Sequence, residues 1–130
     1  MEHQGVEFHD STLRSVRRVG TDAVLEMRVY VHSSKGRPGW DDGLGWYQDA
    51  EIVVVDAQID EEPDEDLLDI YDGSVRVAQQ LFENLLPLPC EMVGQLEIVL
   101  SGDGGTLIAK GRGIRVSLKG EPGPVEEFRR

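Results

Sequence analysis

The residues best suited to chemistry lie near the two ends of the chain. His9 and Asp10 are adjacent, and Glu121 and Glu126 lie close to the C-terminus. If the two ends meet, an imidazole and three carboxylates could bind a small molecule or a divalent cation, or transfer protons. The spacing is not that of a metal site, which favours a hydrogen-bonded pair that fixes the first strand. We therefore predict no bound metal and no cofactor.

A second candidate is a loop rich in glycine and proline. Trp40 lies there between Gly39 and Asp41, and Asp42 follows. Exposed aromatic residues on loops are typical of protein-binding surfaces. Trp46 and Tyr47 are instead expected to begin the next strand and to pack in the core. Trp40 is therefore the better candidate for binding.

The net charge of −12 is concentrated in the middle of the chain. Residues 38–75 hold 13 of the 25 acidic residues and no lysine or arginine, whereas the remainder is close to neutral. Such a field attracts a basic protein and repels nucleic acid and anionic membranes. The run lacks the spacing of a calcium-binding EF-hand loop, and the simpler alternative is a solvated linker. Its densest part contains Asp60, Glu61, Glu62, Asp64, Glu65 and Asp66.

The single cysteine, Cys90, cannot form an intramolecular disulfide. A neighbouring glutamate should raise its pKa, so a buried and inert thiol is the expected state. Neither a signal peptide nor a membrane-spanning apolar run is visible, and the cytoplasm is the expected location. The glycine turns do not match a phosphate-binding loop, so no nucleotide site is predicted.

Alternating apolar residues predict an all-β chain whose clearest part is residues 95–119. Leu96, Ile98 and Leu100 share one face, and glycine turns at 102–105 and 111–113 would divide this stretch into three strands. Residues 6–19 and 23–32 predict a hairpin around Gly20. Residues 46–59 predict one long strand, and its middle is apolar on both faces, as in the centre of a sheet.

Residues 67–90 allow two interpretations. Asp72-Gly73 is typical of a hairpin turn between short strands, which we favour, whereas Ser74 could cap a short helical turn near 77–85. The prolines at 87 and 89 predict an extended, irregular segment over 86–89. The whole chain, 1–130, is predicted to be a single-domain antiparallel β-sandwich or flattened barrel of about eight or nine strands. It would carry an acidic linker at 60–66 and a Pro/Gly-rich tail at 120–130, anchored by Val125 and Phe128.

Several short segments together resemble a group of small, uncharacterised bacterial β-rich proteins. They are the Phe-His-Asp-Ser opening at 8–11, Asp72-Gly73, residues 84–89, and the close at 120–121 and 125–128. The resemblance implies an all-β single domain and assigns no catalytic or binding residue.

The leading functional hypothesis is a non-enzymatic protein-binding module. Its acidic region 38–75 would be the contact surface and Trp40 an anchor, and an immunity-type inhibitor of a basic protein is one concrete form. The competing hypothesis is a small-molecule or metal-binding domain built on His9, Asp10, Glu121 and Glu126. A structural module that self-associates through an exposed strand edge is a third. Strand order and oligomeric state do not follow from the sequence.

Overall fold

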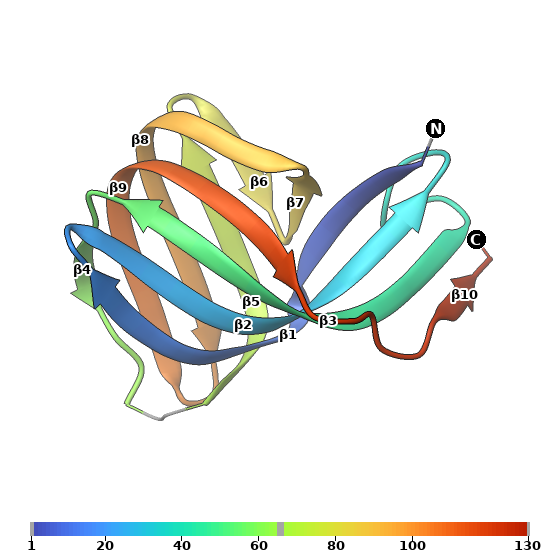
Figure 1. Cartoon of the computed structure of the whole chain (residues 1–130), viewed down its shortest axis with the longest axis horizontal. Coiled ribbons are helices and arrows are strands. Elements are labelled where there is room, and N and C mark those ends of the chain that lie inside the picture. Colours follow the sequence, from blue (N-terminus) through green and yellow to red (C-terminus); the bar gives the residue numbers. More distant parts are fainter. Residues whose placement is uncertain (1, 65–66, 130) are drawn as a thin grey trace.

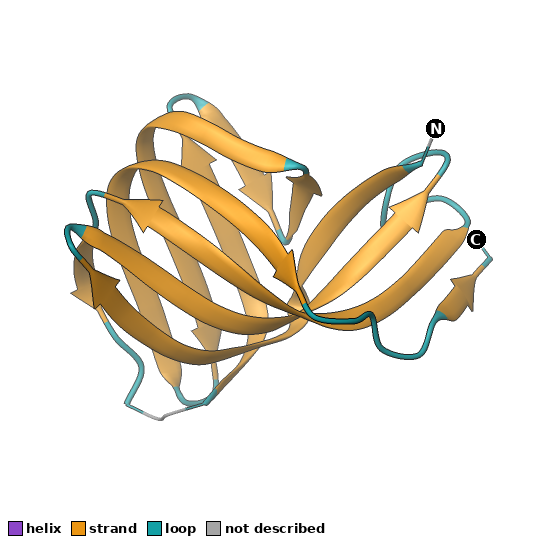
Figure 2. Cartoon of the chain, viewed as in Figure 1, coloured by secondary structure: helices purple, strands orange, loops and turns teal. Residues whose placement is uncertain are grey.

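The computed structural model describes residues 2–64 and 67–129, and over these ranges the chain forms strands and loops without a helix (Figure 2). The strands are β1 (His3–Val19), β2 (Asp22–Ser34), β3 (Gly43–Val55), β4 (Gln58–Glu61), β5 (Leu68–Val77), β6 (Gln80–Glu83), β7 (Leu85–Leu88), β8 (Cys90–Gly102), β9 (Gly105–Lys119) and β10 (Glu126–Phe128). The predicted all-β class is confirmed, although the described residues form ten strands instead of eight or nine.

Six strands close into an antiparallel barrel (Figure 1). Going around it, β1 pairs with β2, β2 with β3, β3 with β9, β9 with β8, β8 with β5, and β5 again with β1. The four short strands lie outside this ring, where β4 pairs with β9, β6 with β5, β7 with β1 and β10 with β3. The architecture is thus a closed barrel with added strands and not an open sandwich.

The barrel interior is filled by the inward faces of its strands. In β2 the predicted alternation is confirmed, since Leu25, Met27 and Val29 are all buried. Ile52 and Val54 of β3 are buried in the same core, and β3 has β2 on one side and β9 on the other, as its two-faced apolar middle predicted. The largest fully buried side chains include Phe8, Leu25, Met27, Ile52, Leu68, Leu86, Ile98, Leu100, Leu107 and Ile114.

Three barrel strands continue beyond the barrel and form a second, smaller sheet. Residues 3–7 of β1 pair with 30–34 of β2, which pair with 43–47 of β3; β7 and β10 complete the two edges. We call this sheet the extension. In Figure 1 it projects from the barrel on the right, with both chain termini and the loop of residues 35–42 at its far end. The chain that follows β4 lies at the opposite end of the molecule.

Two glycine positions predicted as turns lie inside strands. The turn after Gly102 is confirmed, but β9 continues through Gly111 and Gly113. A Cβ atom at Gly111 would lie 2.4 Å from the carbonyl oxygen of Val55. Glycine is needed there because the backbones of β3 and β9 approach each other closely, and the predicted three-stranded meander is therefore wrong.

Asp72-Gly73 is likewise inside β5 and not at a hairpin turn. A Cβ atom at Gly73 would lie 2.6 Å from the Cβ of the fully buried Phe8, so this glycine makes room for a core side chain. The hairpin between β5 and β6 turns instead at Ala78, whose φ is 53°. The alternative of a helical turn near 77–85 is wrong. Residues 86–89, predicted to be extended and irregular, are extended as expected, but those up to Leu88 belong to the regular strand β7.

Residues 46–59 do not form one continuous strand. The chain turns at Asp56, where φ is 49°, and re-enters the sheet as β4. The predicted linker therefore begins later than expected, because Asp60 and Glu61 belong to β4, whereas Pro63 lies outside any strand as expected. Glu65 and Asp66 lie outside the described residues. The described part of the chain contains no helix long and apolar enough to cross a membrane.

Candidate functional site

The His-Asp-Ser segment forms a wide bulge in β1 where the barrel meets the extension. Glu7 pairs with Tyr30 and Thr12 with Arg28, so residues 8–11 face only Val29 of β2. The Ser11 hydroxyl bridges the gap, since it donates to the carbonyl of Glu7 and accepts from the backbone amide of Tyr30. At this bulge β1 changes its second neighbour from β7 to β5.

Asn84, the corner between β6 and β7, satisfies the backbone of that bulge. Its carbonyl oxygen accepts from Phe8 N at 2.7 Å, and its side-chain oxygen accepts from His9 N at 2.7 Å. Its φ is 62°, a left-handed conformation that asparagine tolerates better than most residues. His9 Nδ1 donates to the carbonyl of Tyr71 at 3.1 Å, while its Nε2 lies 3.6 Å from the carboxylate of Asp10.

A nearly buried acid–imidazole pair lies next to the bulge. The Nε2 of His32 is 2.9 Å from a carboxylate oxygen of Glu7, and His32 is only 4% exposed. The side-chain amide of Asn84 also donates to Glu7 at 3.4 Å. The hydrogen bond from His32 holds the pKa of Glu7 below its usual value, although burial opposes the shift. This pair ties β1 to β2 within the extension.

Aromatic rings cover the same face of the extension. Tyr30 makes edge contacts with His32, Tyr47 and Phe128 at centroid distances of 5.0, 4.8 and 6.0 Å. The Tyr30 hydroxyl donates to Glu126 at 3.0 Å. Burial, followed by that hydrogen bond, raises the pKa of Tyr30, and burial also raises the pKa of Tyr47. These ring contacts and the hydrogen bond to Glu126 hold β10 against β3.

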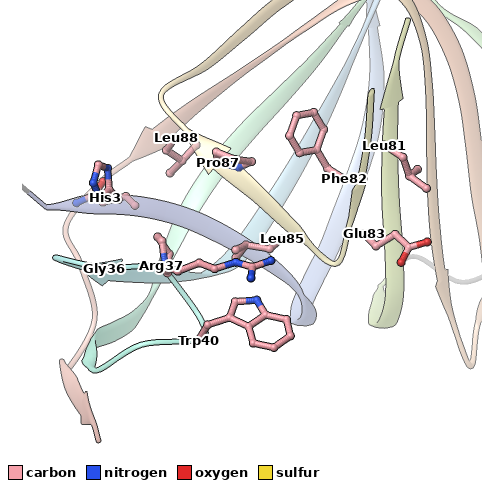
Figure 3. A pocket seen from close by; sticks show the side chains of 12 residues that line it. His3, Gly36, Arg37, Trp40, Leu81, Phe82, Glu83, Leu85, Pro87 and Leu88 are labelled. Atoms are coloured by element: carbon pink, nitrogen blue, oxygen red, sulfur yellow. The ribbon is translucent and has the colours of Figure 1, made fainter. Parts of the chain in front are cut away.

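A groove of about 840 Å³ lies between the extension and β6. One wall is the loop of residues 35–42 with the start of β1, and the other is β6 and β7 (Figure 3). The lining combines apolar side chains with an imidazole, a guanidinium, an amide and a carboxylate. The lining residues are His3, Gln4, Gly36, Arg37, Pro38, Trp40, Leu81, Phe82, Glu83, Leu85, Pro87 and Leu88.

Trp40 is the most exposed aromatic side chain in this groove, at 62%. It is held by a turn in which the amides of Trp40 and Asp41 both donate to the carbonyl of Arg37, at 3.0 and 2.9 Å. The Asp41 carboxylate accepts from the backbone amide of Arg37 at 2.5 Å. The Arg37 guanidinium lies over the indole, with its carbon 4.5 Å from the ring centroid (Figure 3).

The other predicted aromatic residues behave differently from each other. Trp46 is half-buried, packs against the core as expected, and donates from Nε1 to Gln48 at 2.9 Å. Tyr47 is 38% exposed and lies in the aromatic cluster outside the barrel, so its predicted place in the core is wrong. Of the two expected tail anchors, Phe128 packs on the extension, whereas Val125 is exposed.

The four predicted ligand residues lie in three different elements of the chain. His9 and Asp10 lie in the β1 bulge, Glu126 is bonded to Tyr30, and Glu121 is exposed in the chain between β9 and β10. Within residues 2–64 and 67–129 no three His, Cys, Asp or Glu side chains are grouped so that they could hold a metal ion. A small-molecule site on these four residues stays a prediction.

The acidic block does not form one surface. Asp49 pairs with Arg14 and Arg28, both at 3.1 Å, and Asp60 pairs with Lys110 at 3.3 Å. A hydrogen bond from Gln58, and then Lys110, lowers the pKa of Asp60. Glu61, Glu62 and Asp64 are exposed. The chain that follows β4 lies at the barrel end of the molecule, whereas the loop of residues 35–42 lies at the far end of the extension (Figure 1).

Cys90 is 4% exposed, as expected for an inert thiol. Burial raises its pKa to about 11, and this burial, not the adjacent glutamate, is the cause.

Sequence reasoning did not identify the groove, because its two walls come from segments far apart in the chain. The local pattern of residues 81–88 predicts only short strands, a helical turn or an irregular segment. One local signal was available. Arg37 and Trp40 flank Pro38-Gly39, a turn dipeptide that brings residues three apart into contact.

Comparisons with protein-family models, with curated proteins and with solved structures give no match for this chain.

Proposed function

We propose that this protein is a non-enzymatic protein-binding module that holds its partner in the groove beside Trp40. The observation that carries the proposal is the exposure of a tryptophan, held by a turn and covered by an arginine, in a hollow with apolar and polar lining residues. Tryptophan and arginine are enriched among residues that dominate binding energy. A fixed side chain also loses less conformational entropy when it binds.

We further propose that the partner is a basic protein and that an immunity-type inhibitor is the concrete form. The support is the net charge of −12, which raises the association rate of a basic molecule wherever the final contact lies. Glu61, Glu62 and Asp64 would contribute to this long-range attraction from the end opposite the groove.

The test is retention of proteins from native lysate on three immobilised forms: wild type, Trp40→Ala and Val93→Ala. Val93 is 91% exposed at the β8 bulge, outside the groove, so it controls for the loss of an exposed apolar side chain. We expect a basic protein that wild type and Val93→Ala retain and Trp40→Ala binds about 30-fold more weakly, with weaker retention at high salt.

Retention that does not depend on Trp40, or no retained protein at either salt concentration, contradicts the proposal. In a second comparison, the triple variant Glu61→Gln, Glu62→Gln, Asp64→Asn should lower the association rate and leave the dissociation rate unchanged.

A further inference from the structure

We propose that the groove binds a short extended segment of the partner protein, in which an Asp or Glu carboxylate pairs with Arg37. An apolar side chain beside that carboxylate would pack between Trp40 and the wall formed by β6 and β7. This inference rests on the proposed function and adds the chemistry of the segment that docks.

The guanidinium of Arg37 is held ready for such a ligand. The guanidinium carbon lies 4.5 Å from the centre of the indole ring, and this cation–π contact does not use the N–H groups as hydrogen-bond donors. Among residues 2–64 and 67–129, no carboxylate or carbonyl accepts a hydrogen bond from the Arg37 side chain. A carboxylate can accept two parallel hydrogen bonds from the N–H groups of a guanidinium.

The Arg37 side chain favours an acidic group over a basic one at this position, although the chain as a whole is acidic. The chain has 25 acidic and only 13 basic residues, yet the Arg37 side chain has no ion pair in the described structure. The carboxylate closest in sequence, Asp41, is engaged by the backbone amide of Arg37. Arg37 therefore brings a guanidinium without an ion pair among the described residues to a groove whose lining also holds the carboxylate of Glu83. Such a guanidinium complements a carboxylate even on a partner that is basic overall.

The opposite wall supplies apolar contacts. Leu81 is 43% exposed, and Phe82, Leu85 and Leu88 are half-buried along the groove. Among the described residues β7 pairs with β1 alone, which leaves its other edge without a strand, but Pro87 lies in β7. Proline in an edge strand leaves a gap in the N–H groups that an added strand would need. Recognition therefore relies on side chains in the groove and not on extension of the sheet.

The probe is a phage library of random short peptides, selected on the wild-type protein at physiological salt. We expect enriched sequences with Asp or Glu next to a large apolar residue. Binding of one enriched peptide is then measured by fluorescence anisotropy for wild type, Arg37→Gln, Arg37→Lys and Trp40→Ala. Arg115→Gln is the matched control, since Arg115 is exposed on β9 and is not part of the groove lining.

Replacing the peptide carboxylate by its amide should weaken binding to wild type about tenfold or more. Arg37→Gln should cause a similar loss, and the two changes together should cost no more than either alone. Arg37→Lys should recover only part of the affinity, because lysine offers no bidentate fork. Arg115→Gln should bind like wild type.

Each contrary outcome has a separate meaning. Enriched peptides without an acid, or an affinity that Arg37→Gln does not change, overturn the carboxylate assignment, whereas Trp40-dependent retention of a protein from lysate would still uphold the proposed function. Phenylacetate that binds as tightly as the peptide would show a small-molecule site. Concentration-dependent self-association that Trp40→Ala abolishes would make a second copy the occupant. Either of these two results also overturns the inference.

Discussion

The contact between Gly73 and Phe8 gives a quantitative test of how β5 lies against β1. A Cβ atom at Gly73 would lie 2.6 Å from Phe8 Cβ, 2.8 Å from Phe8 Cγ and 3.0 Å from Leu100 Cδ2. Carbon atoms prefer separations of about 3.5 to 4.0 Å, so Gly73→Ala creates an overlap of roughly 1 Å with an atom fixed to the backbone. A rotamer change cannot relieve a clash with Cβ.

The barrel must therefore widen between β1 and β5, and Phe8, which is fully buried, must lose contacts. Overpacking of this kind lowers the free energy of unfolding by about 1 to 3 kcal/mol. The largest loss to expect is that of removing a buried phenylalanine side chain, about 3 to 5 kcal/mol. We expect Gly73→Ala to lower the free energy of unfolding by about 2 to 4 kcal/mol, measured by urea denaturation with an unchanged slope.

Gly20→Ala is the control, because Gly20 has a φ of 61° and no heavy atom within 4 Å of the added Cβ. Its cost should come from backbone strain alone, about 1 to 2 kcal/mol. If Gly73→Ala is no more destabilising than Gly20→Ala, Phe8 does not pack on Gly73, and the placement of Asp72-Gly73 inside β5 is refuted.

Three further predictions concern hydrogen bonds and burial. The pKa of Glu7 is lowered in the folded protein, so the ionised carboxylate stabilises the fold above the ordinary pKa of 4.5, and this contribution is lost as the pH falls below 4.5. Glu7→Gln should therefore flatten the acid limb of a stability–pH curve. It should also lower the free energy of unfolding at pH 7 by about 1 to 3 kcal/mol. An equally steep acid limb in the variant would contradict this. Asn84→Ala should destabilise the fold more than Asn84→Gly. Both variants lose the hydrogen bond to His9 N, but only alanine is strained at a φ of 62°. Urea denaturation gives the free energy of unfolding of both variants, and equal losses would show that backbone strain contributes nothing. With its pKa raised to about 11, Cys90 should react with iodoacetamide at pH 8 far more slowly in the native protein than in urea; equal rates would mean that the thiol is accessible.

Local patterns were sufficient for the strands whose two faces have different environments. In β2, alternate residues are apolar because one face lines the barrel, and period-two alternation expresses that directly. The hairpin at Gly20 and the turn after Gly102 were predicted for a similar reason, since a tight turn imposes its own conformational demand on the residues that form it.

Glycines inside strands misled the sequence interpretation. Gly73 and Gly111 lie in segments whose composition is typical of turns. Each glycine is required, however, because another segment comes within contact distance of its backbone. A single sequence does not distinguish a glycine needed for its conformation from one needed for its lack of a side chain. That distinction depends on which strand is the neighbour, and hence on barrel closure.

The sequence by itself determined the all-β class, the buried face of the long strands and the candidacy of Trp40, because these depend on residue type and near-neighbour spacing. Only the tertiary structure decided how the charges and the functional surfaces are distributed. Closure of the barrel brings Arg14, Arg28 and Lys110 to acidic residues of the middle block. Because β1, β2 and β3 extend beyond the barrel, the loop of residues 35–42 lies at the opposite end of the molecule from the chain that follows β4. The docking of β7 on β1 then builds the second wall of the groove. Electrostatic pairing and concave surfaces arise between segments remote in sequence, and these contacts exist only once the chain is folded.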